Sequence, residues 1–292
     1  MDDVLGYEGR RVLVTGAASG IGAATAELLV SLGAQVHAAD LNPVTVDGVG
    51  KTYRVDLADA GSIDTLVEGL GGGLDALFNC AGVPGTAPPQ TVLLVNFCGL
   101  RHLTESVVAS MPAGAAVCCV GSTSAAGWLQ RLELSAELLA TAGFDEARRW
   151  CEANVDRLGY VYDFSKEAVN AYTAFRNVDF LADAKVRINC VNPGSTRTAA
   201  TPEFTKAVKA KALGEELLKN YPRLMGRLAR PVEQAWPLVF LNSERASFIT
   251  GASLNVDAGL VGGLVTGRFP PVVAAAMRWT PVAGAAAAAA TA

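Results

Sequence analysis

Short runs of apolar, mostly β-branched residues alternate with longer helix-like segments along most of the chain. Strands buried on both faces read as continuous apolar runs, whereas apolar positions three and four residues apart indicate helices. The runs predict strands at 11–15, 35–40, 53–57, 76–78, 116–120, 186–191 and 253–256, with helices at 23–32, 59–70, 90–111, 163–184 and 231–242. Such alternation predicts an α/β fold with a right-handed, doubly wound parallel sheet.

Two segments and the C-terminal tail depart from this alternation. Residues 128–160 mix leucines with Arg and Glu in helix-like order and predict two short amphipathic helices joined near Gly143. Residues 199–226 look helical and mobile. The tail, 264–292, is apolar, contains prolines and ends in alanines. It can pack on a neighbouring subunit, cover a pocket or be disordered, and we expect residues 1–263 to form a single domain.

Composition and charge narrow the class of protein. Hydrophobic residues make up 51% of the 292 positions and charged residues 18%, which excludes wholesale disorder. The formal net charge is −4 and no run of Lys or Arg occurs, so we expect no nucleic-acid partner. No uncharged apolar stretch reaches membrane-spanning length, and the acidic start is unlike a secretion signal. Six cysteines without ligand spacing predict reduced thiols, no metal and a cytoplasmic protein.

A glycine-rich turn links the first predicted strand to the first predicted helix. Its residues are Gly16, Ser19, Gly20, Ile21 and Gly22. Backbone amides and a helix N-terminus at such a turn can bind the diphosphate of a dinucleotide. A tight turn that uses glycine only for packing is the alternative, and the strand–turn–helix context favours the nucleotide.

Asp40 ends the second predicted strand, 20 residues after Gly20. At this distance a carboxylate can accept hydrogen bonds from both hydroxyl groups of an adenosine ribose. The carboxylate would repel a 2′-phosphate, and neither Ser19 nor Leu41 supplies a positive charge. We therefore expect NAD rather than NADP, with an ordinary turn residue as the alternative reading of Asp40.

Tyr162 and Lys166 lie four positions apart in a predicted helix, so their side chains share one face. An ammonium group close to a phenol favours the phenolate, and we expect it to bring the pKa of Tyr162 down toward neutrality. A phenol with such a pKa can exchange a proton with an alcohol or a ketone. The pair alone is weak evidence, because this spacing also arises by chance.

Polar residues stand out in two other predicted segments. Asn96 and Gly99 lie inside the predicted helix 90–111, although neither residue type favours a helix. Asn96 is therefore either a functional residue or a tolerated surface residue. Ser122 and Ser124 follow a predicted strand at its carboxyl end, where ligands bind in parallel sheets. An ordinary Ser/Thr-rich loop is the alternative there.

Together and in order, these motifs resemble the short-chain dehydrogenase/reductase family, from Arg10 to about Leu260. The matching residues are Thr15-Gly16-x-x-x-Gly20-Ile21-Gly22, Asp40, Asp56-Leu57, Asn79-x-Ala81-Gly82, Asn96, Ser124, Tyr162-x-x-x-Lys166 and Pro193-Gly194-x-x-x-Thr198. The chain departs from the family pattern at Cys80 and Thr196. It also has two candidate serines, of which Ser124 fits the register better, and an unusual 38 positions from Ser124 to Tyr162.

The resemblance implies a single Rossmann-type domain with a seven-stranded parallel sheet, helices on both faces and a homodimer or homotetramer. It implies reversible hydride transfer between an alcohol carbon and the nicotinamide of NAD. The implied catalytic residues are Asn96, Ser124, Tyr162 and Lys166. The implied cofactor-binding residues are Gly16, Ser19, Gly20, Ile21, Gly22, Asp40, Leu41, Asp56, Leu57, Asn79, Ala81, Gly82, Tyr162, Lys166, Pro193, Gly194, Thr196 and Thr198.

The family scheme gives each catalytic residue a role. Tyr162 exchanges the proton, while Lys166 stabilises its phenolate and binds the nicotinamide ribose. Ser124 hydrogen-bonds the substrate oxygen where charge develops. Asn96 holds a water that links Lys166 to solvent.

The long insertion narrows the resemblance and bears on the substrate. Together with residues 81–87 it looks like the bacterial 3α-hydroxysteroid dehydrogenase/carbonyl reductase branch and the coniferyl-alcohol dehydrogenases. Residues 128–134 also look similar to the insertion of the latter. The insertion and residues 199–226 would roof an apolar cleft. We expect a bulky apolar alcohol that is steroid-like, alicyclic or aromatic, with Ser124, Trp128 and Tyr162 as its contacts.

Other functions stay open at this point. One is a coniferyl-type aromatic primary alcohol dehydrogenase, and another is a protein that senses NAD without catalysis. A third is epimerisation or dehydration with tightly held NAD. Arg131 and Arg197 also leave a charged substrate open.

Overall fold

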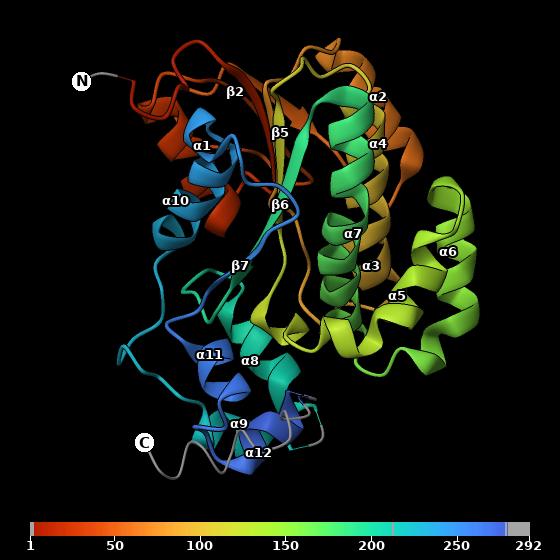
Figure 1. The fold of residues 1–292 in the computed structure, drawn as a ribbon, viewed down its shortest axis with the longest axis vertical. Coiled ribbons are helices and arrows are strands. Elements are labelled where there is room, and N and C mark those ends of the chain that lie inside the picture. Colours follow the sequence, from red (N-terminus) through yellow and green to blue (C-terminus); the bar gives the residue numbers. More distant parts are fainter. Residues whose placement is uncertain (1–2, 212, 278, 280–292) are drawn as a thin grey trace.

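A computed structural model of the chain describes residues 3–211, 213–277 and 279. In this part of the chain seven parallel strands form one sheet in the order β3-β2-β1-β4-β5-β6-β7 (Figure 1). The strands are β1 (Arg11–Thr15), β2 (Gln35–Asp40), β3 (Lys51–Arg54), β4 (Ala76–Asn79), β5 (Ala116–Val120), β6 (Arg187–Pro193) and β7 (Ser253–Val256). The predicted doubly wound, seven-stranded parallel sheet is confirmed.

Helices cover both faces of the sheet (Figure 1). Successive side chains of a strand point to opposite faces. Leu13 and Val14 of β1 accordingly belong to two different buried clusters. The cluster of Val14 lies under α1 (Gly20–Ser31) and α10 (Pro231–Asn242), and that of Leu13 under α2 (Ala60–Leu70), α4 (Leu100–Val108) and α7 (Val161–Ala184). Both faces of the sheet are therefore buried, which explains its continuous apolar strands.

The predicted helix 90–111 is interrupted. A π-helix, η1 (Leu94–Gly99), joins α3 (Pro89–Leu93) to α4. A Cβ atom at Gly99 would lie 2.0 Å from the carbonyl oxygen of Leu57, so no larger residue fits there. Asn96 in the same π-helix is fully buried. Its reading as a tolerated surface residue is therefore wrong.

The predicted third strand also differs, because β3 ends at Arg54 instead of reaching residue 57. The backbone N–H of Val55 still donates to the carbonyl of Asp40 in β2 (2.9 Å). The next N–H, of Asp56, donates instead to the Ser62 hydroxyl (2.9 Å). The chain therefore leaves the sheet at this point.

The insertion folds into two helices, as predicted. They are α5 (Leu132–Leu139) and α6 (Gly143–Asn154), flanked by the 3-10 turns η3 (Trp128–Arg131) and η4 (Val155–Arg157). The pair lies beside α7 in Figure 1. Arg131 anchors it there, since its guanidinium lies 2.9 Å from the buried Glu167 carboxylate of α7 and donates to the Leu158 carbonyl.

Four short helices cover the carboxyl ends of the strands (Figure 1). They are α8 (Thr201–Lys209), α9 (Gly214–Asn220), α11 (Leu260–Val265) and α12 (Pro271–Ala276). The helical prediction for 199–226 is thus confirmed for α8 and α9. Leu217, Leu264 and Val273 bury one another in a separate small core, which joins α9 to α11 and α12. The Ala-rich end from residue 280 lies outside the described residues.

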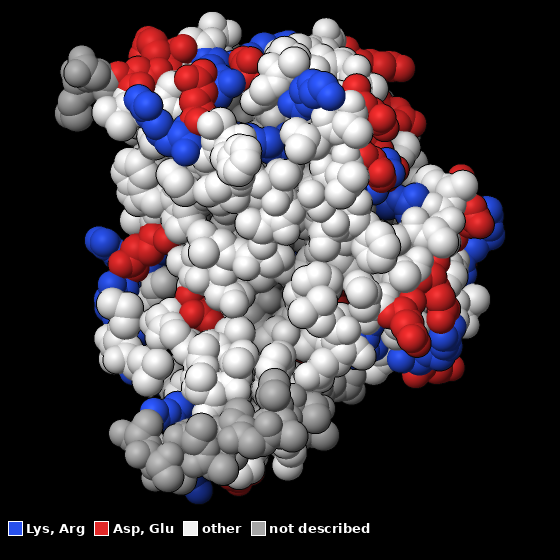
Figure 2. All heavy atoms as spheres, in the orientation of Figure 1, with Lys and Arg blue, Asp and Glu red and all other residues white. Residues whose placement is uncertain are grey.

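Charged side chains gather toward the margins of the face in Figure 2, and its middle is mostly uncharged. Within the described residues, no helix is long and apolar enough to cross a membrane. The same residues contain no group of His, Cys, Asp and Glu arranged as a metal site. All six cysteines are free thiols.

Candidate active site

A cavity of about 530 Å³ lies at the carboxyl ends of the central strands. Most of the predicted site residues line it: Gly16, Ser19, Gly20, Ile21, Gly22, Asp40, Leu41, Asp56, Leu57, Ala81, Gly82, Ser124, Tyr162, Lys166, Pro193, Gly194, Thr196 and Thr198. Asn79, Asn96 and Trp128 lie outside the described lining. The sheet order places the end of β2, with Asp40, across β1 and β4 from the end of β5, with Ser122.

The glycine turn brings backbone close to the cavity. Gly16 has a φ of +69°, and a Cβ atom there would lie 2.7 Å from the backbone of Ala81. The Ser19 side chain does not cap the 12-residue helix α1 that follows. Backbone N–H groups at the start of a helix lack intrahelical partners, and the helix dipole favours negative charge there. This end of the cavity therefore suits an anion such as a diphosphate.

Asp40 stands beside the turn, at the end of β2. One carboxylate oxygen accepts a hydrogen bond from the backbone N–H of Ala18 (3.0 Å) and the other from that of Asn42 (2.8 Å). Each carboxylate oxygen has lone-pair capacity left for another donor. Among the described lining residues the cations are Lys166 and Lys211, both of which lie with Tyr162 rather than with Asp40. The Asp40 end is therefore acidic.

Asn79 supports the site from below its surface. Its amide donates to the Thr104 hydroxyl (2.8 Å) and to the Cys119 sulfur (3.6 Å), which ties β4 to α4 and β5. The next residue, Cys80, departs from the family pattern. Its backbone N–H donates to Thr15 Oγ1 (3.1 Å), its thiol is hydrogen-bonded to Thr25, and the residue lines the cavity.

Asn96 connects the segment after β4 to α7. Its Oδ1 accepts from the Val83 N–H (2.8 Å), and its Nδ2 donates to the Val83 carbonyl (3.1 Å) and to the Ser165 hydroxyl (3.2 Å). The side chain thus fixes Val83, which lines the cavity. Its role in holding a water beside Lys166 stays a prediction.

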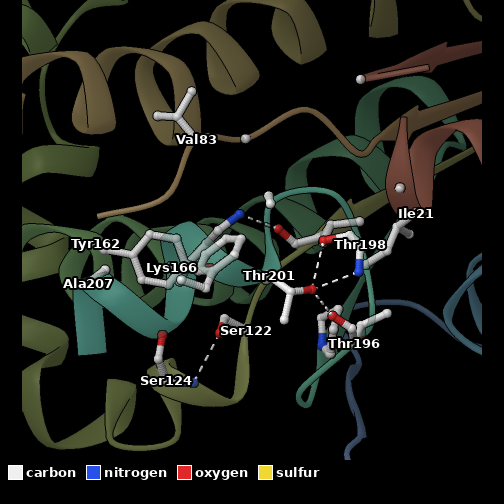
Figure 3. Close-up of a pocket in the computed structure, with 18 of the residues that line it drawn as sticks. Ile21, Val83, Ser122, Ser124, Tyr162, Lys166, Thr196, Thr198, Thr201 and Ala207 are labelled. Atoms are coloured by element: carbon white, nitrogen blue, oxygen red, sulfur yellow. Dashed lines mark hydrogen bonds between the residues drawn. The ribbon is translucent and has the colours of Figure 1, made fainter. Parts of the chain in front are cut away.

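Ser122, rather than Ser124, is hydrogen-bonded to Tyr162. The Ser122 hydroxyl also accepts from the Ser124 N–H (3.1 Å), as the dashed line in Figure 3 marks. The Ser124 hydroxyl is buried without a hydrogen-bond partner among the described residues. Ser122 is therefore a second candidate for the serine that acts with Tyr162, and the role of Ser124 at the substrate oxygen stays a prediction.

Lys166 points toward β5, where its Nζ donates to the Val120 carbonyl (2.8 Å). Burial lowers the pKa of this ammonium to about 8. Burial also raises the pKa of Tyr162 well above its usual value, against the hydrogen bond with Ser122, which lowers it. The expectation of a Tyr162 pKa near neutrality is therefore wrong for the chain by itself, because desolvation of the phenolate outweighs the hydrogen bond with Ser122 and the nearby Asp163 carboxylate raises the pKa further.

Apolar side chains form much of the cavity wall on the Tyr162 side. The ring of Phe204 on α8 meets the Tyr162 ring edge-on, with 5.4 Å between their centroids and 71° between their planes. The rest of this wall is formed by Val83, Tyr160, Ala207, Val208, Leu217, Leu228, Ala276 and Met277. Ala276 ends α12 and Met277 follows it, so this part of the predicted tail covers the pocket.

The insertion contributes less to the wall than predicted. Trp128 is half-buried and lies outside the described lining, so its predicted substrate contact has no support in the geometry. Arg131 is paired with Glu167, and neither it nor Arg197 belongs to the described lining. Tyr160, the last insertion residue before α7, does line the cavity.

Comparison with known proteins adds to this geometry. Residues 10–136 match the family described as short chain dehydrogenase, and residues 150–261 match the family described as enoyl-(acyl carrier protein) reductase. The chain is 34% identical to a coniferyl-alcohol dehydrogenase of Pseudomonas sp. strain HR199 over 258 residues, which cover 88% of this chain and 98% of that protein.

The chain belongs to the short-chain dehydrogenase/reductase family. It is also 29% identical to a 3-alpha-hydroxysteroid dehydrogenase/carbonyl reductase of Comamonas testosteroni, with 85% of this chain and 95% of that protein covered. A 3-alpha-hydroxysteroid dehydrogenase of Pseudomonas sp. B-0831, solved in complex with NADH, matches with a TM-score of 0.71 and 31% identity over 89% of this chain and all of that one. The predicted family is confirmed, and so is the predicted similarity to both branches.

Enzymes of this family are oxidoreductases that use a nicotinamide cofactor, and the site of this member fits one. The uncapped start of α1 suits a diphosphate, and the free acceptor capacity of Asp40 suits ribose hydroxyls. Lys166 and Tyr162 line the same cavity on the far side of the turn.

Several residues of this short-chain dehydrogenase/reductase site were missed from the sequence. They lie in α8 and α12 or just after α8, α9 and α12: Phe204, Lys211, Tyr221, Ala276 and Met277. These segments contain no family motif. The signal that could have located them is that they follow strands of the parallel sheet and therefore begin at its carboxyl edge. The position of α12 depends on packing against α9, which no local pattern reveals.

Proposed function

We propose that this protein is an NAD-dependent oxidoreductase that interconverts a bulky apolar alcohol and its ketone or aldehyde by hydride transfer. The supporting observation is the meeting of Tyr162, Ser122 and Lys166 in one cavity with the glycine turn and Asp40. The relatives named as coniferyl-alcohol and hydroxysteroid dehydrogenases support an alcohol as the substrate class.

The chain's own residues handle the proton and the substrate oxygen. A bound nicotinamide supplies the hydride chemistry, so the protein has to orient and polarise. In oxidation Tyr162, as phenolate, takes the proton of the substrate hydroxyl, and in reduction it returns that proton to the carbonyl oxygen. Ser122 takes the role first given to Ser124 and hydrogen-bonds the same oxygen where negative charge develops. Because burial disfavours the phenolate in the chain alone, Lys166 and the cofactor's positive charge have to stabilise it.

The preference for NAD follows from the charge at the Asp40 end. A 2′-phosphate would be placed against the Asp40 carboxylate, and the two described cations of the lining lie with Tyr162. A pair of ribose hydroxyls would instead donate to that carboxylate.

The cavity wall favours an uncharged and bulky substrate. The groups around Tyr162 are mostly aliphatic or aromatic, among them Phe204, Val208 and Met277. An aromatic primary alcohol of the coniferyl type is the second candidate, supported by the 34% identity to the coniferyl-alcohol dehydrogenase. A protein that senses NAD without turnover is weakly supported, because Tyr162, Lys166 and a serine are all present.

One experiment tests the function. The purified protein is given NAD or NADP with a panel of steroid, phenylpropanoid, terpene and simple secondary alcohols, and the appearance of free NADH or NADPH is followed. We expect reduction of NAD with bulky apolar alcohols and its loss in Tyr162→Phe, which should still bind NAD. Equal use of both cofactors would contradict the cofactor assignment, and full turnover by Tyr162→Phe would contradict the mechanism. Turnover without release of NADH would support the epimerase or dehydratase alternative.

Exposed aromatic side chains bear on the assembly of the protein, and its free thiols bear on its location. Trp236 and Phe240 on α10 and the nearby Phe248 expose much of their rings, which supports a homodimer or homotetramer. Six free thiols fit a reducing compartment, and we place the protein in the cytoplasm. Sedimentation of the purified protein distinguishes dimer from tetramer.

A further inference from the structure

A buried ion pair lies in the wall of the cavity, next to Tyr162. The Nζ of Lys211, between α8 and α9, donates to both carboxylate oxygens of Asp163, at 2.7 and 2.9 Å. Only 14% of the Lys211 side chain and 6% of the Asp163 side chain are exposed. Both residues line the cavity, and neither has a role in the proton transfer described above.

The surroundings of this pair are apolar. The Lys211 Nζ lies over the ring of Tyr160, 4.0 Å from its centroid, and Phe204 and Val208 line the cavity from the preceding helix. Charges in such a site are screened less than charges in water. An ammonium group here would attract an anionic ligand strongly if the carboxylate did not neutralise it.

The described lining has three other charged groups. Asp40 and Asp56 belong to the far end of the cavity. Lys166 lies beside Tyr162, but its Nζ donates to the Val120 carbonyl at the end of β5. The charge of the wall formed by the start of α7 and the segment after α8 therefore depends on Asp163 and Lys211 together.

We propose that Asp163 neutralises Lys211 and thereby makes the substrate end of the cavity select uncharged molecules. The pair is thus a determinant of substrate specificity, and this inference rests on the proposed function. Removal of the Asp163 charge leaves an ammonium group free to bind a carboxylate of the substrate. Removal of the Lys211 charge leaves a carboxylate that favours a substrate ammonium group. Removal of both charges restores a neutral wall.

Binding of three ligands of one size tests this inference without turnover. The probes are cinnamyl alcohol, cinnamate and cinnamylamine, and their dissociation constants are measured by calorimetry on the full-length protein. The variants are Asp163→Asn, Lys211→Met and the double variant. We expect Asp163→Asn to bind cinnamate at least about tenfold tighter than wild type, relative to cinnamyl alcohol, because hydrogen bonds to charged groups contribute this much. Lys211→Met should bind cinnamylamine at least about tenfold tighter than wild type, relative to cinnamyl alcohol, and the double variant should match wild type in both ratios.

Glu167→Gln is the matched control. Glu167 is also a buried acid of α7 paired with a cation, Arg131, at 2.9 Å, but it lies outside the described lining. Its variant should lose stability, seen as a lower melting temperature, without a change in the ratio of the three affinities. This comparison separates a change of charge in the cavity from a general loosening of α7.

Two results would overturn the inference. One is a change of less than about twofold, relative to cinnamyl alcohol, in the affinity of folded Asp163→Asn for cinnamate and of folded Lys211→Met for cinnamylamine. The other is an absence of binding of all three probes to wild type and variants. If Asp163→Asn does not fold, Lys211→Met and the double variant decide the question. A failure of NAD reduction in the alcohol panel would instead count against the proposed function, because these affinities need no turnover.

Discussion

Ser122 and Ser124 show how one side chain's direction decides its chemistry. Both follow β5, and both line the cavity. Ser122 has extended backbone (φ −168°, ψ 150°) and precedes the 3-10 turn η2 (Thr123–Ala125), which contains Ser124. In this turn the Ser124 N–H donates to the Ser122 hydroxyl, and the Ser122 hydroxyl is hydrogen-bonded to Tyr162. The motif register identifies a hydroxyl cluster, but only the turn geometry identifies the serine that contacts the phenol.

Substitution of each serine should separate the two. We expect Ser122→Ala to lower kcat by about 10²–10³-fold, as loss of a donor to a developing oxyanion does, with KM for NAD unchanged. Ser124→Ala should keep kcat within about threefold, since no contact to Tyr162 is removed. Steady-state rates with the best alcohol of the panel measure both. The reverse ranking of the two variants would restore Ser124 as the catalytic serine.

Burial of Lys166 should also be visible in the pH dependence of stability. Its pKa of about 8 in the folded chain lies below the value of about 10.4 for an unfolded chain. The unfolded state therefore binds more protons between these values, and the destabilising effect of Lys166 is largest below pH 8 and fades as pH rises. In Lys166→Met, the free energy of unfolding relative to wild type should fall by about 2 kcal/mol between pH 7.5 and 9.5.

The difference in unfolding free energy between wild type and Lys166→Met is measured, because the buried thiols change stability with pH in the direction opposite to Lys166. Burial raises the pKa values of Cys80 and Cys119 to about 12, so their contribution to stability declines as pH rises through the alkaline range. The desolvation of these thiols is common to both proteins and cancels in the difference, whereas the lowering of their pKa values by Lys166 is lost in the variant. Denaturant unfolding at several pH values measures the difference, and a flat difference would mean that Lys166 is not desolvated.

At the scale of elements, local pattern predicted most strands and helices because each has its own periodicity. The sheet order follows from βα alternation and the right-handed crossover rule. The π-helix η1 was not predicted, although Asn96 and Gly99 marked the place as unusual. The Leu57 carbonyl approaches Gly99 within it, a contact between segments far apart in the chain. The pairing of Phe204 with Tyr162 was missed for the same reason.

Gly99→Ala tests this account of the π-helix. The added Cβ would lie 2.0 Å from the Leu57 oxygen, so the backbone has to shift, and we expect a loss of at least about 2 kcal/mol of unfolding free energy. Gly61→Ala in α2 is the control, because its Cβ would meet only Asp59 Oδ1, at 3.5 Å. That change should leave stability equal or higher by up to about 1 kcal/mol. Equal effects of the two changes in denaturant unfolding would show that η1 tolerates a side chain.

At the scale of the whole molecule, the cavity is assembled from residues between Gly16 and Met277. The half that fits the cofactor carries the family motifs and was predicted residue by residue. The half around Tyr162 is closed by α8, α9 and α12, whose positions depend on the small core shared by Leu217 and Val273. Substrate size should therefore be set by the last described helix of the chain, far in sequence from the catalytic residues.

Ala276→Phe tests this dependence of substrate size on α12. Ala276 is buried and lines the cavity, so a phenyl group there should occupy space that a bulky alcohol needs. We expect kcat/KM for the best bulky alcohol to fall by at least about tenfold, while a small secondary alcohol and NAD keep their values, because only the filled volume discriminates. Ala275→Phe, on the exposed side of the same helix, should change neither substrate. If both variants lowered activity toward bulky and small alcohols alike, α12 would act through stability and the cavity wall would have to be sought in α8 and α9.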